Sequence, residues 1–571
     1  MPTHTKRCSG RFPACRAETS REGPTAGLFT VLSAFVILLS APCAHADATL
    51  VGHWRLLGDI TDISGREAHA VNHGVTLTPE GAVFDSKDAC IEVLPDKIGL
   101  PATGEFSVSV WVRGADRDGE CFGDVVSLFD ITERKGFSLA VQTRRGVTSA
   151  QTNWENPFFG VNNGAPETPW TDCGRPGDNN MVWALCVYAG ALYAGTFETG
   201  KDQTGHVYRY EGGTAWADCG APHPSNAITA LAVHDGSLYA AASHYRAGGS
   251  ALAESENLVP GGRVFRYEGG AAWTDCGGLG DSEAVGGMAV FNRRLYATSM
   301  YSPAGMYRYA GDAVWESCGD PGYRVEALSV FQDALYAAGW DAERPGIFRY
   351  DGTAWAYCGT PPDIHQSYSF ATYAGRLYVG TWPNAAIYRY GGGNLWEDCG
   401  RLAEEEREVM AMAAYNGALY AGSLPLAAVY RYEPSNRWAS TGRLDLTPDV
   451  KYRRVWSMAV YQGKLFAGTL PSGRVYAMEA GKCVTHDHAL APGWNHLIAV
   501  REREHIRLHV NGALAAEAAC PADRYPLPEN TSLRIGRGPH DAFHGAMRDL
   551  RIYNRALTDA ETRDLAAVRP E

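Results

Sequence analysis

Residues 184–220 read ALCVYAGALYAGTFETGKDQTGHVYRYEGGTAWADCG, and this stretch recurs along the middle of the chain. Each copy holds a small and apolar run, a Leu-Tyr-Ala-Gly-Thr run, a Val-Tyr-Arg-Tyr run and a run headed by Trp. We name these runs a, b, c and d. Run d begins at Trp170, Trp216, Trp273, Trp315, Trp355, Trp396 and Trp438. A period of about forty residues with four short strands predicts a β-propeller, and seven copies predict seven blades.

The array starts and ends out of phase. It opens with a lone run d at Trp170 and closes with runs a, b and c over residues 455–478. We expect the first run d to complete the last blade. This pairing would close the ring by backbone hydrogen bonds and hide two strand edges.

The hairpin glycines, the Leu-Tyr pair, run c and the Trp at the head of run d resemble the kelch-type repeat over residues 170–478. The doubled glycine of that repeat is replaced here, for instance by Gly195-Thr196. The resemblance implies four-stranded antiparallel blades. By analogy with other propellers, ligands are expected at the mouth of the central channel, between the b–c and d–a loops.

The two flanks of the array carry a second pattern. The run FSVSVWV at 106–112 alternates between two faces, as expected for strands with one buried face. With the motifs GWNHL at 493–497 and LRIYNRAL at 550–557, it resembles the laminin-G-like, concanavalin-A-like jelly roll. Neither flank has enough strands to close a sandwich alone.

We therefore expect an all-β protein in which a seven-bladed β-propeller is inserted into a split concanavalin-A-like jelly-roll sandwich. The expected parts are residues 47–150 and 481–571 for the two jelly-roll halves and 165–480 for the propeller. Insertion at an exposed loop is tolerated when the ends of the inserted domain lie close together.

Residues 1–46 are predicted to be a signal peptide. Basic residues precede the apolar run Leu28 to Leu39, and Ala44-His45-Ala46 supplies a small-x-small cleavage signal. The prediction is export, to a secreted, cell-surface or periplasmic location, with no stable membrane insertion after cleavage. An uncleaved anchor, or a lipoprotein linked at Cys43, are the alternatives.

The chain carries a formal net charge of −13. An acidic protein without Lys/Arg clusters is a poor partner for nucleic acid and is repelled by anionic membranes. The expected partner is a glycan or an extracellular protein, and the oligomeric state is left open.

Six of the fourteen cysteines stand three residues after the Trp of run d, where we expect small buried hydrophobes. Cys90, Cys121, Cys186, Cys483 and Cys520 are candidates for disulfide bonds in an oxidising compartment, for example Cys90 with Cys121. The repeated Arg of run c is expected to pair with the Asp that follows Trp by two residues in run d, as a structural contact.

The residue that follows the Gly-Thr of run b should point into the channel mouth. The predicted ligand-binding set is Phe197, His244, Met300, Trp340 and Trp382. Aromatic rings beside polar groups suit stacking on sugar faces. The alternative is that these apolar residues plug the channel. The long segment His244 to Gly262 is expected to overhang this face.

The jelly-roll resemblance also implies a Ca²⁺ site, at Asp62 in an Asp-x-Ser-Gly loop and at Asp549 before the last strand. Because Ca²⁺ takes 6–8 oxygen ligands, backbone carbonyls would supply most of them. The alternative is that both carboxylates serve turns and strand ends. No other cofactor is expected.

No catalytic motif stands out: the sequence has no Gly-x-Ser-x-Gly, HExxH or phosphate-binding loop. We favour a secreted, non-catalytic recognition protein that binds carbohydrate or protein through the propeller mouth and the jelly roll. The alternative is a secreted carbohydrate-active enzyme with its site at the mouth and a sugar-binding jelly-roll module. Two or three carboxylates about 5–9 Å apart at the mouth would favour the enzyme.

Overall fold

The fold is built from β-strands. The computed structural model describes residues 48–114, 123–144, 149, 151–321, 324–340 and 346–568, without the side chains of Arg144, Glu326 and Trp340. Within these ranges there is one α-helix, α1 (Asp559–Ala567), and three short 3₁₀ helices, η1 (Pro95–Lys97), η2 (Ala247–Ser250) and η3 (Ala522–Arg524). The predicted signal peptide and Cys121 lie outside the described residues.

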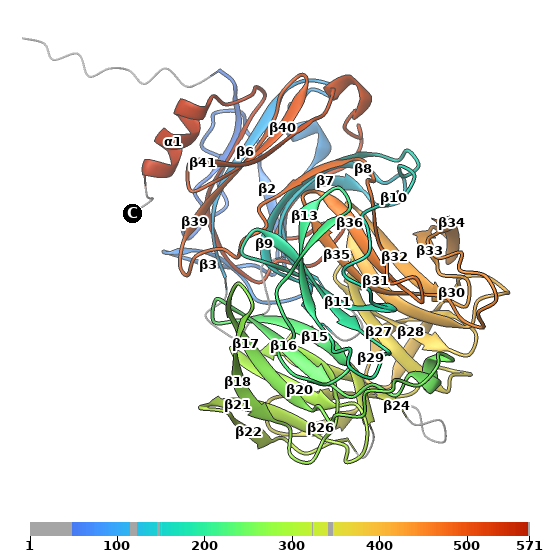
Figure 1. Ribbon diagram of the computed structural model, residues 1–571. Coiled ribbons are helices and arrows are strands. Elements are labelled where there is room, and N and C mark those ends of the chain that lie inside the picture. The colour runs from blue at the N-terminus through green and yellow to red at the C-terminus, as the bar shows by residue number, and fades with distance from the viewer. Residues whose placement is uncertain are drawn as a thin grey trace, which may run out of the picture. The chain divides into compact units, whose positions relative to one another are not determined.

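Two antiparallel sheets form the concanavalin A-like sandwich. The first sheet contains β1 (Leu50–Trp54), β3 (Thr76–Thr78), β4 (Gly81–Phe84), β6 (Phe106–Gly114), β39 (Asn495–Arg501), β40 (His505–Val510), β41 (Ala513–Ala519) and β43 (Gly545–Tyr553). The second contains β2 (Ala70–His73), β5 (Cys90–Val93), β7 (Gly123–Asp130), β8 (Lys135–Arg144), β9 (Asn153–Asn163), β38 (Lys482–Thr485) and β42 (Leu533–Ile535). In Figure 1, β6, β39, β40 and β41 run side by side and α1 lies next to β41.

Strands from both ends of the chain pair in this sandwich, as the flanking motifs predict. β6 lies between β39 and β43 and pairs with both, so an N-terminal strand is held by two C-terminal ones. The core is shared in the same way, since Val108, Leu497 and Ile552 are fully buried in one cluster. β9, which lies beyond the predicted boundary at residue 150, pairs with β8 and β38. The repeat array therefore leaves the sandwich after β9 and returns at β38.

The repeat units fold into antiparallel strands in the order a, b, c, d. They comprise β11 (Met181–Tyr188), β12 (Ala191–Phe197), β13 (Val207–Gly212) and β14 (Ala215–Asp218); β15 (Ala227–His234), β16 (Ser237–Ser243), β17 (Arg263–Gly269) and β18 (Ala272–Gly278); β19 (Val285–Phe291), β20 (Arg294–Ser299), β21 (Met306–Gly311) and β22 (Val314–Ser317); β23 (Arg324–Phe331), β24 (Ala334–Trp340), β25 (Gly346–Tyr350) and β26 (Trp355–Tyr357); β27 (Gln366–Tyr373), β28 (Arg376–Trp382), β29 (Ala386–Gly392) and β30 (Leu395–Arg401); β31 (Glu408–Tyr415), β32 (Ala418–Leu424), β33 (Ala428–Glu433) and β34 (Arg437–Arg443); and β35 (Arg454–Tyr461), β36 (Lys464–Leu470), β37 (Val475–Met478) and β10 (Thr171–Asp172).

The prediction of seven separate blades is wrong in its count. Five four-stranded sheets stand as separate blades, and the other two repeat units share one eight-stranded sheet. The two units are joined at one point, where Phe197 at the end of β12 pairs with Ala227 at the start of β15. The backbone N–H of Glu198 also donates to the carbonyl of Asn226 at 3.0 Å. The kelch type of the repeat stays a prediction.

The ring closes as its phase predicts. β10 pairs with β37, with Thr171 opposite Ala477 and Asp172 opposite Tyr476. The innermost strands, run a of each unit, contact one another in order from β11 to β35, and β35 contacts β11. One strand from the start of the array thus completes the sheet formed at its end.

The recurring Trp and Cys positions of the repeat join neighbouring units. The indole Nε1–H of Trp216 donates to the carbonyl of Cys173 in the preceding unit at 2.9 Å, and the same bond joins Trp273 to Cys219. The repeat cysteines are free thiols, buried except for the half-buried Cys318. Among the described residues, Cys90, Cys186 and Cys520 are also free thiols, and no predicted disulfide is seen there.

The predicted pairing of the run c Arg with the run d Asp is wrong, because the register places them on opposite faces. Arg209 lies opposite Ala217, whereas Asp218 lies opposite Tyr208. Asp218 instead contacts His206 and accepts a hydrogen bond from the N–H of Gly220. In other units the Arg pairs with glutamates, as in Arg389 with Glu397.

Residues 149 and 151–153 contact the inner strands at the a–b hairpin end of the ring. The amide of Gln151 donates to the carbonyl of Val290 and accepts from its N–H, both at 2.6 Å. Asn153 makes the same two bonds to Val460. The side-chain amides thus form paired hydrogen bonds with backbone groups at the edges of the inner strands. All four amide and backbone groups are thereby satisfied away from water.

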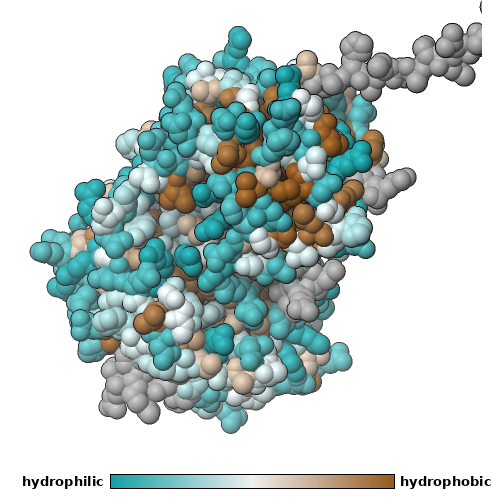
Figure 2. Space-filling model, turned by 180° about the vertical axis from the view of Figure 1, so that it is seen from behind, coloured by the Kyte–Doolittle hydropathy of each residue, from teal (hydrophilic) through white to brown (hydrophobic). Residues whose placement is uncertain are grey.

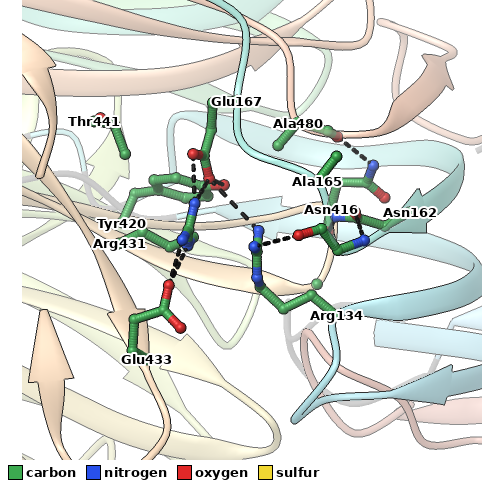
Figure 3. Close-up of polar contacts among 12 residues, drawn as sticks. Arg134, Asn162, Ala165, Glu167, Asn416, Tyr420, Arg431, Glu433, Thr441 and Ala480 are labelled. Atoms are coloured by element: carbon green, nitrogen blue, oxygen red, sulfur yellow. Dashed lines mark hydrogen bonds and ion pairs between the residues drawn. The ribbon is translucent and has the colours of Figure 1, made fainter. Parts of the chain in front are cut away.

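A buried ionic cluster joins the β7–β8 hairpin, the segment before β10 and the β31–β34 blade (Figure 3). The Glu167 carboxylate accepts from the Arg431 guanidinium and from the Tyr420 hydroxyl, the latter at 2.8 Å. Arg134 lies 3.7 Å from the same carboxylate. The three charged side chains are 6–12% exposed. We call this set of four residues the Glu167 cluster.

The surface is mostly polar on the face seen in Figure 2, where apolar residues gather in small patches. The most exposed large apolar side chains, among them Leu258, Leu395 and Leu446, are far apart in sequence. In the described part of the chain, no helix is long and apolar enough to cross a membrane.

Candidate functional site

Run a of every repeat unit is irregular near its start. The pairing of β11 with β12 skips Trp183, that of β27 with β28 skips Tyr368, and that of β35 with β36 skips Trp456. A bulge of this kind turns a side chain away from the regular face of its strand. Trp183, Tyr368 and Trp456 accordingly meet in one apolar cluster. We call it the central cluster.

Aromatic rings fill the central cluster. The Trp183 ring packs edge-on against Trp456, with centroids 4.5 Å apart, and against Tyr245 at 4.7 Å. Two of the predicted ligand residues belong to it: Phe197 is fully buried against Tyr245, and Met300 is 2% exposed. In this structure both are buried in the central cluster.

The other predicted mouth residues lie nearer the surface. The His244 ring is 3.6 Å from the Glu283 carboxylate. Trp382 is half-buried at the edge of the central cluster, and its ring meets that of His365 at 5.2 Å. Trp340 ends β24 and pairs with Arg324 through the backbone. The predicted roles of these residues in ligand binding stay predictions.

A row of polar and aromatic residues borders the central cluster on one side. The first residues of run a in three consecutive units are Gln366, Glu408 and Arg454. Because they share one repeat position, they follow one another around the mouth. We call the following six residues the mouth arc: Gln366, Tyr368, Trp382, Glu408, Tyr452 and Arg454.

Contacts run along the mouth arc without a break. Trp382 pairs with Gln366 across β27 and β28, and the Tyr368 hydroxyl donates to Gln366 Oε1 at 2.5 Å. Tyr368 also acts on Glu408, whose pKa it lowers. Arg454 lies 3.9 Å from Glu408. The arc therefore couples three blades through side chains that sequence reasoning did not single out.

The charged pair at the centre of the mouth arc is almost fully buried. The side chains of Glu408 and Arg454 are 5% and 6% exposed. Burial raises the pKa of Glu408, and the charge of Arg454 and the hydrogen bond to Tyr368 oppose that shift. The 3.9 Å separation exceeds a hydrogen bond, so the two groups attract by charge without a direct hydrogen bond.

Three buried N–H donors, two in the central cluster and one on Arg454, have no acceptor among the described residues. They are the indole Nε1 atoms of Trp183 and Trp456 and the Nε of Arg454. These residues are 0%, 3% and 5% exposed. A buried donor without a partner costs about 1–3 kcal/mol, so native proteins seldom keep several together. Such a set of donors indicates a place where acceptor groups bind.

The b–c segment His244 to Gly262 covers this place, which agrees with its predicted overhang. Tyr245 and Ala247 are buried in the central cluster and Leu252 packs against it. The Arg454 guanidinium donates to the carbonyl of Ser250 at 3.2 Å. Further along, the Asn257 amide donates to the carbonyls of Gln203 and Pro224, which ties the segment to the neighbouring unit. We call residues 244–262 the cover segment.

The carboxylates predicted to bind Ca²⁺ accept hydrogen bonds from the chain itself. The Asp62 carboxylate accepts hydrogen bonds from the N–H groups of His53, Ser64 and Ala68 and from the Ser64 hydroxyl. Asp549 is held by the Arg551 guanidinium and by His53. Each carboxylate is thus occupied by donors of the chain, with a cation beside Asp549. The described residues contain no cluster of three or more metal-ligating side chains.

Comparisons with known proteins identify part of the chain. Residues 461–563 match the family model described as the concanavalin A-like lectin/glucanases superfamily. This match covers the second half of the sandwich and the last strands of the ring. No curated protein sequence matches the chain.

Several solved structures are similar over about half of the chain. Virginiamycin B lyase from Staphylococcus aureus has a TM-score of 0.42 and 10% identity, covering 54% of this chain and 98% of the lyase. YCF48 bound to D1 peptide has a TM-score of 0.40 and 11% identity, with coverages of 55% and 97%. BamB from Moraxella catarrhalis has a TM-score of 0.31 and 10% identity, with coverages of 52% and 83%. At these scores the similarities carry no functional argument.

The protein is thus an all-β chain in which propeller-like blades accompany a concanavalin A-like domain. Both parts fit a binding role.

Proposed function

We propose that the protein is an exported, non-catalytic recognition protein that binds a glycan at the mouth arc. The observation that carries the proposal is the arc itself. Half-buried rings, Trp382 and Tyr452, border polar groups on Gln366, Glu408 and Arg454. A sugar has an apolar face and a rim of hydroxyl groups, which suits a ring beside hydrogen-bonding side chains.

The presence of a single carboxylate in the mouth arc favours binding over glycoside hydrolysis. Hydrolases of the common kind use two carboxyl groups about 5–9.5 Å apart. Among the described side chains of the arc, Glu408 is the single carboxylate, and the charge that acts on its pKa comes from Arg454. The arc therefore supplies one buried ion pair and not a pair of acids.

The sandwich offers a second surface for the same role. The indole ring of Trp494 lies under two guanidinium groups, with Arg548 at 4.3 Å and Arg113 at 5.0 Å from its centroid. Ring and cations on one sheet face suit a glycan or an extracellular protein. The proposal of export rests on the N-terminal sequence, residues 1–46.

A glycan array probed with residues 48–571, with and without Ca²⁺, tests the proposal. Ligands found there are then titrated against the Trp382→Ala and Trp494→Ala variants. A stacking contact worth about 1–2 kcal/mol predicts a loss of about five- to thirtyfold for Trp382→Ala. Trp494→Ala should keep the mouth affinity. Absence of any glycan ligand, or equal affinities of wild type and Trp382→Ala, would refute binding at the mouth.

A further inference from the structure

The buried ion pair of the mouth arc is balanced in charge, but the arc and the central cluster together hold N–H donors without acceptors. Glu408 and Arg454 contribute one negative and one positive charge, and they are 3.9 Å apart. Trp183, Trp456 and Arg454 each add an N–H donor that has no acceptor in the described part of the chain. A ligand that fits must accept hydrogen bonds there without upsetting the charge balance.

This charge balance limits which net charge a bound ligand can carry. A carboxylate placed beside the pair would leave two negative charges against one positive charge in a site with little access to water. An ammonium group would leave the reverse excess. Uncompensated charge is strongly disfavoured where side chains are buried. A hydroxyl group is neutral, and it can accept from an N–H while donating to a carboxylate.

We infer that the mouth binds a neutral saccharide, which places two neighbouring hydroxyl groups beside Arg454 and Glu408 and a ring face near Trp456. This inference rests on the proposed function and names its ligand class. The hydroxyl oxygens take the free donors, and one hydroxyl proton goes to Glu408. Because the guanidinium and the carboxylate are separated by more than a hydrogen bond, a hydroxyl can bridge them.

The cover segment controls access of a ligand to the buried donors. Its residues Tyr245 and Leu252 lie on the central cluster, and Ser250 accepts from the same Arg454. Because the segment covers the buried donors, we expect it to move when a ligand binds there. Weakening the contact of Leu252 should therefore speed both association and dissociation.

Binding of matched neutral and acidic sugars tests the inference. Tetrasaccharides of gluco, galacto, manno and xylo configuration are compared with their C6-carboxylate counterparts, where these exist, by calorimetry on residues 48–571. The neutral members should bind at least tenfold more tightly. Glu408→Gln makes the site net positive. The affinity for the acidic members should therefore rise at least tenfold relative to the affinity for the neutral ones.

Two further variants keep the test decisive. Glu406→Gln is the matched control, since Glu406 is also buried but its Oε1 is bonded to Ser423 and Tyr430, so it should leave the selectivity unchanged. If Glu408→Gln does not fold, Arg454→Lys keeps the charge and loses the Nε donor. This variant should lower the affinity for neutral sugars at least tenfold. The neutral sugars should still bind more tightly than the acidic ones.

The outcomes separate the two proposals. Equal binding of neutral and acidic sugars by the wild type, or an unchanged preference in Glu408→Gln, overturns the neutral-saccharide inference and leaves glycan binding intact. Absence of binding to any sugar overturns both.

Discussion

The Glu167 cluster predicts a large loss of stability from a change of very small size. Glu167→Gln keeps the shape of the side chain and removes one negative charge. Arg134, Arg431, Glu167 and Glu433 together are neutral, so the variant leaves one uncompensated positive charge. Removing one partner of a buried ion pair costs about 3–5 kcal/mol. The side chains involved are 6–12% exposed, apart from Glu433 at 22%, so the full effect is expected.

The magnitude converts to a measurable shift in the melting temperature. An unfolding entropy of about 2.1 cal/mol/K per residue gives about 1.1 kcal/mol/K for a unit of about 520 residues. A loss of 3–5 kcal/mol then lowers Tm by about 3–5 °C. The assay is differential scanning calorimetry of residues 48–571.

The matched control is Glu397→Gln. Glu397 pairs with Arg389, which holds the position of Arg431 in the preceding repeat unit. Both of these side chains are more than 40% exposed. Exposed pairs contribute about 0–1 kcal/mol, so Tm should fall by less than about 1 °C. A shift of less than 1 °C for Glu167→Gln would refute the claim that buried charge balance holds the cluster together.

The same cluster predicts a pH dependence. Burial opposes ionisation of Glu167, but hydrogen bonds from Arg431 and Tyr420 outweigh it and lower its pKa below 4.5. Its carboxylate therefore stabilises the fold fully above pH 4.5, and this contribution is lost as the pH falls through the lowered pKa. The Tm difference between wild type and Glu167→Gln should shrink below pH 4.5. A constant difference down to pH 2 would contradict this.

Two further predictions concern how the parts are joined. Gln151→Ala leaves the N–H and C=O of Val290 unpaired at the inner edge of the ring and should cost about 2–4 kcal/mol, measured as a fall in Tm against Gln203→Ala as an exposed control. Residues 48–150 expressed alone should not give a cooperatively folded product, because β6 then lacks both β39 and β43. A dispersed amide spectrum with a sharp melting transition would show instead that this half folds independently.

Much of the fold follows from the sequence because its signals are local and repeated. The spacing of Trp in run d and the four short runs of each copy predicted four-stranded repeat units, and the phase of Trp170 predicted that β10 completes the last sheet. The burial of Cys173 and its counterparts followed from their position in run d. Hairpin turns such as Asn416-Gly417, where both residues have positive φ, are likewise encoded by adjacent residues.

The site was predicted only in part. The end of run b led to Phe197 and Met300, which are core residues, and to Trp382, which is at the rim. The bulged residues Trp183 and Trp456 were missed, although each is the only Trp of its unit's run a. Their alternation looked like that of any core strand. A comparison of the first residues of run a across the units, which differ as Gln366, Glu408 and Arg454, was the available signal.

By itself, the sequence determined the strand content, the repeat units, the closure of the ring and the division of the sandwich into two flanks. Those features depend on periodicity and turn chemistry within a few dozen residues. Only the tertiary structure decided that two units share one sheet, that Gln151 and Asn153 bind the inner strands, and that Glu408, Arg454 and two indoles converge under the cover segment. These features depend on distances between residues far apart in the chain, and a bulge or a one-residue register difference changes which side chains meet.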